Sequence, residues 1–253
     1  MELLVSVTCA EDALAAVAGG ADIIDAKDPS KGALGTVTPD DFAAIRAAVP
    51  HERVVSAALG DAGSGDMARS AAELVALGAG FVKVGFANVV DPVRAGALLA
   101  EIVRAVSRET ARSGVVAVAY ADASRARSID ARTVVRVAAD AGACGVLVDT
   151  ADKSGAGLME LWSPAELCDW VAAVRELGMM ASVAGRLGLD DIALVSSAGA
   201  DVVGVRGAAC VGGRSGRVSV ELVRRLRDAI TPSRLETPTA AQPTTRWKAE
   251  ARS

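Results

Sequence analysis

The chain has 253 residues, 51% of them hydrophobic, and its 27 basic and 31 acidic residues leave a formal net charge of -4. That length and composition suit one large α/β domain with a sizeable core. No basic cluster offers the electrostatic surface that nucleic acids require, and no apolar run reaches the roughly 18 residues of a membrane span. We therefore expect a protein that binds a small molecule rather than a nucleic acid or a membrane.

A Gly-Ala dipeptide recurs along the chain at intervals of 57 to 64 residues, at 20–21, 78–79, 142–143 and 199–200. Each glycine closes a helical pattern, as a helix C-cap does, and each opens a short apolar strand. Further strands are predicted before and between these copies, at 3–7, 53–59, 115–120 and 179–183. Helices are predicted at 10–18, 39–48, 66–77, 91–109, 130–140, 163–176, 188–198 and 215–230.

Eight strands alternating with helices, in units of about 30 residues, are the pattern of a TIM barrel. A doubly wound open sheet is the alternative, but it explains the two-unit period less well. It would also carry a glycine-rich turn after the first strand, where residues 6–10 contain no glycine. We predict a single (β/α)8 barrel over residues 1–230. Residues 231–253 are rich in proline and threonine and lack apolar periodicity, so we predict a disordered tail.

Lysine is scarce in this chain, because only five of the 27 basic residues are lysines. Two of them lie inside apolar strand patterns, in Asp22-Ile-Ile-Asp-Ala-Lys27 and in Phe81-Val-Lys83-Val-Gly85. A desolvated lysine can lose its proton and attack a carbonyl, which arginine cannot do. A snorkelling lysine on an edge strand is the structural alternative. Two lysines at matched positions favour lysine chemistry.

The single histidine, His51, precedes a predicted strand and would lie at the end of a barrel opposite the active site. One histidine excludes a Ser-His-Asp triad and a multi-histidine metal site. We predict neither a metal nor a cofactor. The cysteines form no Cys-x-x-Cys pair and the chain opens directly on a strand pattern, which favours a reducing cytoplasm. We expect all four to be small core residues: Cys9, Cys144, Cys168 and Cys210.

The repeat also predicts side-chain directions. Five residues after the four glycines lie Asp25, Lys83, Leu147 and Gly204. Seven residues after them lie Lys27, Gly85, Asp149 and Arg206. Positions two apart face the same way, and alternate barrel strands contribute to shared interior layers. Four charged groups should therefore meet near the carboxyl-terminal mouth, namely Asp25, Lys27, Lys83 and Asp149. A buried ring of ion pairs is the structural alternative, but active sites of this fold lie at that end.

Glycines and small residues crowd the ends of the last two strands, in Ser182-Val-Ala-Gly185-Arg-Leu-Gly188 and in Gly204-Val-Arg-Gly207-Ala-Ala-Cys. In barrels the loops after strands seven and eight frequently bind phosphate through backbone N–H groups. Tight turns are the structural alternative. Beside the lysines, these loops predict a phosphate site formed by Gly185, Arg206, Gly207 and Ala208, with Arg186 or Arg214 as further sources of charge.

A phosphate site beside a desolvated lysine and carboxylates is typical of Schiff-base chemistry on a phosphorylated carbonyl compound. A neighbouring cation such as Lys83 would lower the pKa of Lys27, and the aspartates would shuttle protons. From the residues alone we predict a class I aldolase-like enzyme acting on a sugar or triose phosphate. Lys153 lies in the loop that leaves the sixth strand. The residues alone indicate an ordinary, solvated lysine there.

Six segments carry a specific resemblance to a known family: Gly19-Gly-Ala-Asp-Ile-Ile-Asp25-Ala-Lys27-Asp-Pro29, Gly32-Ala-Leu-Gly35, Lys83-Val-Gly85, Tyr120-Ala-Asp122-Ala, Asp149-Thr-Ala-Asp-Lys153 and Asp201-Val-Val-Gly-Val-Arg-Gly-Ala-Ala-Cys210. Over about residues 2–225 the chain resembles the (5-formylfuran-3-yl)methyl phosphate synthases of methanofuran biosynthesis.

The resemblance implies a carbon–oxygen lyase without a metal or redox cofactor. It implies condensation of two glyceraldehyde 3-phosphate molecules into (5-formylfuran-3-yl)methyl phosphate, with loss of one phosphate and two waters. The Schiff base would form on Lys27, assisted by Asp25, Lys83, Asp149 and Lys153. Two alternatives remain: another Schiff-base aldolase of phosphorylated sugars, and a non-catalytic barrel that binds a phosphate metabolite. We also expect a homo-oligomer.

Overall fold

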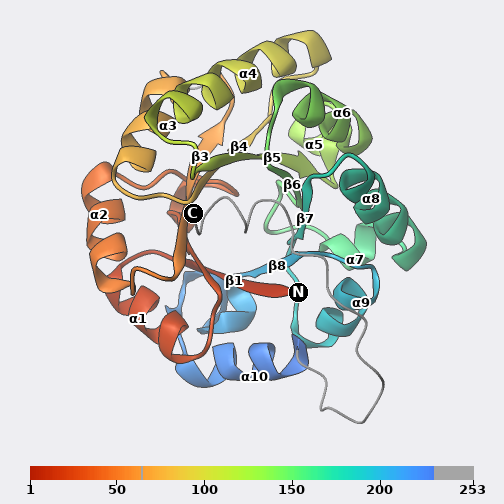
Figure 1. Cartoon of the computed structure of the whole chain (residues 1–253). Coiled ribbons are helices and arrows are strands. Elements are labelled where there is room, and N and C mark those ends of the chain that lie inside the picture. Colours follow the sequence, from red (N-terminus) through yellow and green to blue (C-terminus); the bar gives the residue numbers. More distant parts are fainter. Residues whose placement is uncertain (64, 231–253) are drawn as a thin grey trace, which may run out of the picture.

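The computed structural model describes residues 1–63 and 65–230, and eight parallel strands close into a barrel in the order β1 to β8. Figure 1 looks along this barrel and shows the helices arranged around it. The prediction of a (β/α)8 barrel is confirmed. The predicted disordered tail lies outside the described residues, so the domain boundary at residue 230 stays a prediction. The strands are β1 (Glu2–Val7), β2 (Ile23–Ala26), β3 (Val54–Asp61), β4 (Phe81–Gly85), β5 (Gly114–Tyr120), β6 (Gly145–Asp149), β7 (Met180–Val183) and β8 (Val202–Val205).

The main helices cover the outside of the barrel, and several begin at a side-chain cap. Thr38, Asp91 and Ser163 each accept a backbone N–H of the first turn of their helix, and a proline follows each of them. Such caps satisfy N–H groups that have no partner within the helix. These helices are α1 (Ala10–Ala18), α2 (Pro39–Ala48), α3 (Met67–Ala76), α4 (Pro92–Glu109), α6 (Ala131–Ala141), α8 (Pro164–Glu176), α9 (Ile192–Ser197) and α10 (Val220–Ile230).

The glycines of the Gly-Ala repeat all adopt positive φ, with values of 94° at Gly20, 98° at Gly78, 78° at Gly142 and 79° at Gly199. Only glycine enters this region without a steric penalty, so the chain can leave each helix and turn into the next strand. The repeat that predicts the barrel therefore marks four equivalent helix-to-strand turns.

Two predicted helices differ from those observed. The segment 188–198 begins with a 3-10 turn, Leu189–Asp191, before α9. The last helix begins at Val220 rather than at residue 215, because the preceding chain forms an antiparallel pair of two-residue strands, β9 (Cys210–Val211) and β10 (Arg217–Val218). At Gly216 an added Cβ would lie 1.7 Å from the Val211 carbonyl oxygen, so this turn requires glycine.

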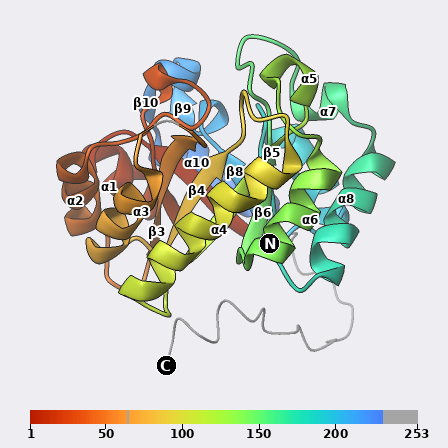
Figure 2. The ribbon, with the colours of Figure 1, turned by 90° about the horizontal axis from the view of Figure 1, so that it is seen from above.

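Two short helices were not predicted from the sequence, α5 (Ala123–Ala126) and α7 (Leu158–Leu161). Each has four residues, which is too short for a helical periodicity to be recognised. Figure 2 shows α5, α7 and the β9–β10 pair at one end of the barrel, at the top of the view. These additions surround the carboxyl-terminal ends of the strands.

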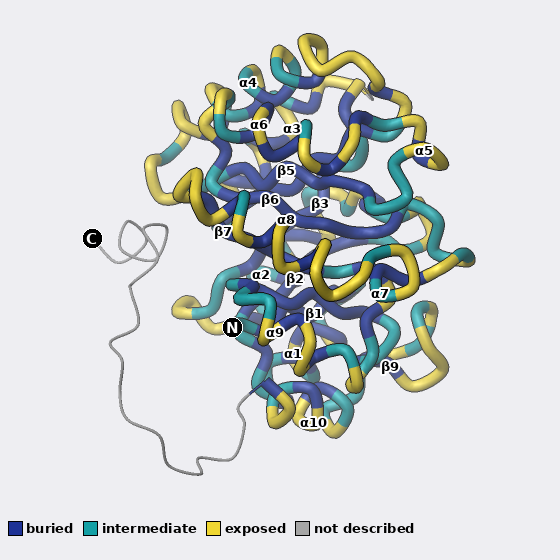
Figure 3. Tube along the Cα trace, turned by 90° about the vertical axis from the view of Figure 1, so that its right-hand side faces the viewer, coloured by how far each residue is buried: buried dark blue, intermediate teal, exposed yellow. Residues whose placement is uncertain are grey.

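Apolar side chains form two layers, one inside the barrel and one between the strands and helices. Figure 3 shows the buried strands enclosed by partly exposed helices. The register places Asp25 of β2 beside Ser56 of β3, and the irregularity in β3 comes only after Ala58. The predicted alternation of side chains therefore holds at the site. The interior layer is formed mainly by Leu4, Ile23, Phe81, Val116, Leu147, Met180 and Val202.

His51 lies exposed before β3, as expected. The expectation of four core cysteines is wrong in part, because Cys168 is exposed on the outer face of α8, Cys9 and Cys144 are half-buried, and only Cys210 is buried.

No described helix is long and apolar enough to cross a membrane. Within the described residues, no group of three or more His, Cys, Asp or Glu side chains is placed to hold a metal ion.

Candidate active site

A cavity of about 430 Å³ lies among the carboxyl-terminal ends of the barrel strands. Leu4, Phe81 and Val116 belong to its apolar part. The structure brings all five predicted catalytic residues together on its wall, from three strands and two of the loops that follow strands: Asp25, Lys27, Lys83, Asp149 and Lys153. This is the end of a barrel where active sites are built.

Asp25 and Lys83 form a fully buried ion pair across β2 and β4, with Lys83 Nζ 2.6 Å from Asp25 Oδ1. Two serine hydroxyls also donate to this carboxylate, Ser56 Oγ to Oδ1 at 2.8 Å and Ser6 Oγ to Oδ2 at 2.9 Å. A buried charge is tolerated only when it is paired and hydrogen-bonded, and Asp25 has three donors. The carboxylate is therefore held in one orientation.

Ser6 and Ser56 were missed by the sequence reasoning. They lie opposite Asp25 in the parallel register of β1, β2 and β3, so they occupy the same layer of the barrel. A serine in a strand is not distinctive by itself. Once the barrel is assumed, polar residues on strands flanking a predicted site are the signal that would have found them.

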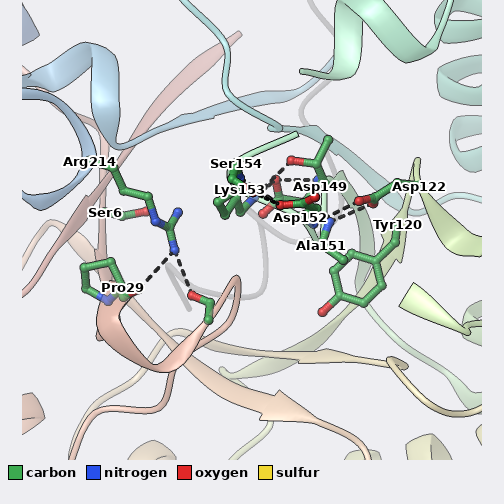
Figure 4. A network of polar contacts seen from close by, with 12 residues as sticks. Ser6, Pro29, Tyr120, Asp122, Asp149, Ala151, Asp152, Lys153, Ser154 and Arg214 are labelled. Atoms are coloured by element: carbon green, nitrogen blue, oxygen red, sulfur yellow. Dashed lines mark hydrogen bonds and ion pairs between the residues drawn. The ribbon is translucent and has the colours of Figure 1, made fainter. Parts of the chain in front are cut away.

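Asp149 and Lys153 form the second ion pair, in which Lys153 Nζ contacts Asp149 Oδ1. Lys153 also lies 3.4 Å from Thr150 Oγ1, and the backbone N–H of Thr150 donates to Asp149 at 2.8 Å. Figure 4 shows Lys153 turned back from its loop onto the end of β6. Burial raises the pKa of the Asp149 carboxyl, but the Lys153 and Lys27 cations more than offset this, so its pKa lies below the ordinary range.

Lys27 differs from the other two lysines, because its amine forms no ion pair or hydrogen bond with any residue in the described part of the chain. Its backbone N–H donates to Val7 at 3.1 Å, which fixes the residue just beyond β2. Burial lowers the pKa of Lys27; Asp25 and Asp149 raise it, Lys83 and Lys153 lower it, and the result is about 7. At pH 7 about half of this buried amine is therefore neutral, and the neutral form is a nucleophile.

The predicted phosphate-binding residues line the same cavity: Gly185, Arg206, Gly207 and Ala208. The guanidinium of Arg206, however, is held by the protein. Its Nη1 donates to Asp12 Oδ2 and to the Ser6 carbonyl, both at 2.9 Å, and its Nε and Nη2 donate to the carbonyls of Arg214 and Gly216. The charge of Arg206 is therefore neutralised by Asp12 of α1, a partner that sequence reasoning missed.

Arg214 is half-buried on the cavity wall and extends across the mouth. Its Nη2 donates to the Gly32 carbonyl at 2.7 Å and lies 3.4 Å from the Pro29 carbonyl, so it links the loop after β8 to the loop after β2 (Figure 4). Among the described residues no carboxylate pairs with Arg214 or with Arg186. Two unpaired arginines thus give the mouth an excess of positive charge.

Comparison with known proteins identifies the family of the chain. A family model described as "4-HFC-P synthase" matches residues 3–227. The (5-formylfuran-3-yl)methyl phosphate synthase of Methanothermobacter thermautotrophicus is 37% identical over 91% of this chain and 99% of the relative. The enzyme of that name from Methanocaldococcus jannaschii is 38% identical over 90% of this chain and 99% of the relative. The chain belongs to the (5-formylfuran-3-yl)methyl phosphate synthase family.

Solved structures show the same barrel fold. The structure of a 3-hexulose-6-phosphate synthase aligns with 91% of this chain over 100% of its own length, with a TM-score of 0.59 and 25% sequence identity. The structure of the 3-hexulose-6-phosphate synthase of Salmonella typhimurium has a TM-score of 0.66 and 19% sequence identity. The alignment covers 91% of this chain and 98% of that one. The family assignment therefore rests on the sequence relatives, and the expectation from the sequence resemblance is confirmed.

Proposed function

We propose that the protein condenses two molecules of glyceraldehyde 3-phosphate into (5-formylfuran-3-yl)methyl phosphate through a Schiff base on Lys27. The observation that carries the proposal is the Lys27 amine, which is buried, unpaired and has a pKa of about 7 inside a cavity lined by two ion pairs. Membership of the family supports the product. The reaction releases one phosphate and two waters, which makes the enzyme a carbon–oxygen lyase.

The side chains of the cavity can perform the first steps of such a reaction. The neutral amine of Lys27 adds to the substrate carbonyl, and loss of water leaves an iminium that acidifies the adjacent carbon. A carboxylate removes the proton from that carbon, and the resulting enamine attacks the carbonyl of the second molecule. Asp25–Lys83 and Asp149–Lys153 each provide a carboxylate beside an ammonium, so each pair can take up one proton and return one during isomerisation and elimination.

Two substrate phosphates need positive charge and N–H donors at the mouth. The loops after β7 and β8 bring Gly185, Gly207 and Ala208 to the cavity, where backbone groups can approach an anion closely. Because Asp12 neutralises Arg206, we propose that the unpaired charge of Arg214 does more of the phosphate binding.

We expect Arg214→Gln to raise the KM for glyceraldehyde 3-phosphate about tenfold, since an arginine–phosphate contact contributes about 1.5–3 kcal/mol. The reaction of unphosphorylated glyceraldehyde with Lys27, measured as trapped adduct, should change little. Steady-state kinetics of Arg214→Gln and Arg214→Lys would show the difference. An equal loss with both substrates would contradict a phosphate role for this side chain.

Product analysis tests the reaction itself. The purified protein is incubated with glyceraldehyde 3-phosphate, and the products are examined by mass spectrometry and by the ultraviolet absorbance of a furan aldehyde. One phosphate released per furan formed is the expected result. A simple aldol adduct without phosphate release would show another Schiff-base aldolase, and the absence of a borohydride-trapped adduct at Lys27 would show a barrel that only binds its ligand.

The pH dependence of adduct formation follows from the pKa of Lys27, which is about 7. The neutral amine is the reactive form, so its fraction falls about tenfold for each pH unit below that value and is nearly constant above about pH 8. We expect the rate of borohydride trapping at Lys27 to rise between pH 5 and 7 and then level off. A rate still rising steeply at pH 10 would indicate an ordinary, solvated lysine.

We further propose a place for this reaction in methanofuran-type cofactor biosynthesis in the cytoplasm. The resemblance to the synthases of methanofuran biosynthesis supports the pathway, and the four free cysteines support the compartment. Association into a homo-oligomer stays a prediction, which light scattering of the purified chain would decide.

A further inference from the structure

The loop that carries Lys153 has few restraints of its own. Residues 151–156 belong to no helix or strand and form no backbone-to-backbone hydrogen bond with the rest of the described chain. Within the loop, Asp152 accepts from the N–H and the hydroxyl of Ser154, which is a local turn. Lys153 nevertheless has to bring its ammonium back to Asp149. Something outside the loop must hold its backbone.

Asp122 provides such a restraint from the neighbouring strand end. Its Oδ1 accepts the backbone N–H of Ala151 at 2.7 Å, and its Oδ2 accepts that of Asp152 at 2.9 Å. Figure 4 shows this carboxylate facing the loop immediately before Lys153. Bonds from backbone N–H groups to an ionised carboxylate are among the strong hydrogen bonds of proteins.

The position of Asp122 makes this use of its side chain unexpected. It is the N-cap residue of α5, where an aspartate ordinarily accepts N–H groups of its own helix. No such bond is formed, and both carboxylate oxygens serve the β6 loop instead. The α5 helix therefore does not explain why this residue is an aspartate.

The contact also continues the pairing of β5 with β6. Tyr120 and Asp149 are the last paired residues of these strands, and the N–H of Ala121 donates to the Asp149 carbonyl at 2.8 Å. The N–H of Thr150 donates to the Asp149 side chain, and Asp122 binds the two N–H groups that follow, those of Ala151 and Asp152. The other contact from this side is the Arg125–Asp152 ion pair at 3.0 Å, but Arg125 is 67% exposed, and exposed pairs contribute little.

We propose that Asp122 is a positioning residue, which binds two successive N–H groups of the β6 loop and so holds Lys153 against Asp149 and toward Lys27. Asp122 lies outside the cavity lining and acts only through the loop. The proposal rests on the role of Lys153 in the proposed function. It adds a residue that neither the lysine count nor the barrel repeat singles out.

The test is Asp122→Asn, which keeps the size of the side chain but leaves one oxygen for two N–H donors. We expect kcat for furan formation to fall about tenfold, within the loss that a misplacement of one ångström can cause. The KM and the trapping of substrate at Lys27 should stay near wild type. Asp130→Asn is the matched control, because Asp130 also accepts two backbone N–H groups, those of Arg132 and Thr133, but at the start of α6.

A double-mutant cycle separates positioning from general support of the fold. In a Lys153→Met background, Asp122→Asn should lower kcat by no more than about twofold, because the group that it positions is already gone. Full wild-type kcat in Asp122→Asn, a loss equal to that of Asp130→Asn, or independent effects of the two substitutions would each overturn the proposal.

Amide hydrogen exchange over residues 149–155 provides a reading that does not depend on activity. Faster exchange in Asp122→Asn than in Asp130→Asn supports the proposal, and unchanged exchange overturns it. If Lys153→Met retained full activity, the role of Lys153 in the proposed function would be wrong, while the exchange result would still decide whether Asp122 holds the loop. Failure of the inference and failure of the proposed function are thus distinguishable.

Discussion

We expect Lys27→Arg to reduce furan-forming activity by about 10³-fold or more and to give no borohydride-trapped adduct. Removal of a covalent nucleophile has effects of this size or larger. Arginine keeps the positive charge and the length but stays protonated at any working pH, so it cannot add to a carbonyl. The measurement is furan formation by absorbance, with mass spectrometry of the peptide that contains residue 27 after reduction.

Two controls separate nucleophile loss from unfolding. Lys27→Met removes a buried amine that has no ion pair, so we expect its stability to denaturant to equal or exceed that of the wild type while activity is lost. Lys31→Arg is the matched surface control, because the Lys31 side chain is 52% exposed and contacts Asp28 at 3.2 Å. It should retain full activity. An active Lys27→Arg enzyme would refute the Schiff base.

Much of this site could be predicted from the sequence because the barrel repeats. The positive φ of Gly20, Gly78 and Gly142 makes glycine necessary at each helix-to-strand turn, so the repeat is visible without an alignment. Strand alternation then places Asp25 and Lys83 in the same interior layer, where the structure finds them paired at 2.6 Å. This prediction was possible because it depends only on local steric rules and on a regular fold.

The hydrogen bonds that fix these groups could not be predicted in the same way. Asp12 and Arg206 are paired although they are 194 positions apart in the chain, and the donors to Asp25 come from strands on both sides of it. Such contacts depend on register and on the distance between packed elements. No periodicity in the sequence reports either of them.

The loop after β8 was mispredicted for a related reason. Its strands have two residues each, which is too short for a strand alternation to be recognised, so residues 215–219 were included in the predicted helix. The close approach of Gly216 to Val211 is what makes the hairpin. This hairpin carries Arg214 between β9 and β10. The sequence predicts Arg214 as a source of charge for the phosphate site, but not the contact with the loop after β2 that places it across the mouth.

The buried Asp25–Lys83 pair leads to the second large expected effect. Asp25→Leu leaves the Lys83 ammonium buried without its partner and removes the acceptor of the Ser6 and Ser56 hydroxyls. Breaking such a pair costs about 3–5 kcal/mol of folding stability. We expect this variant to unfold at markedly lower urea concentration than the wild type, as measured by circular dichroism, and to lack furan-forming activity.

The double variant Asp25→Leu, Lys83→Met decides whether the pair supports the fold or the chemistry. Replacing a buried ion pair by apolar side chains of similar volume is often neutral or stabilising, so we expect the urea midpoint to recover most of the loss. Activity should stay absent, because the Asp25 carboxylate and the Lys83 ammonium can no longer exchange protons or adjust the pKa of Lys27, and the Asp149–Lys153 pair alone does not replace them. Recovery of both stability and activity would mean that the two charges form a structural ion pair, and that Asp149 and Lys153 carry every proton transfer. Recovery of stability alone would show that this barrel keeps two opposite charges in its interior for the reaction at Lys27.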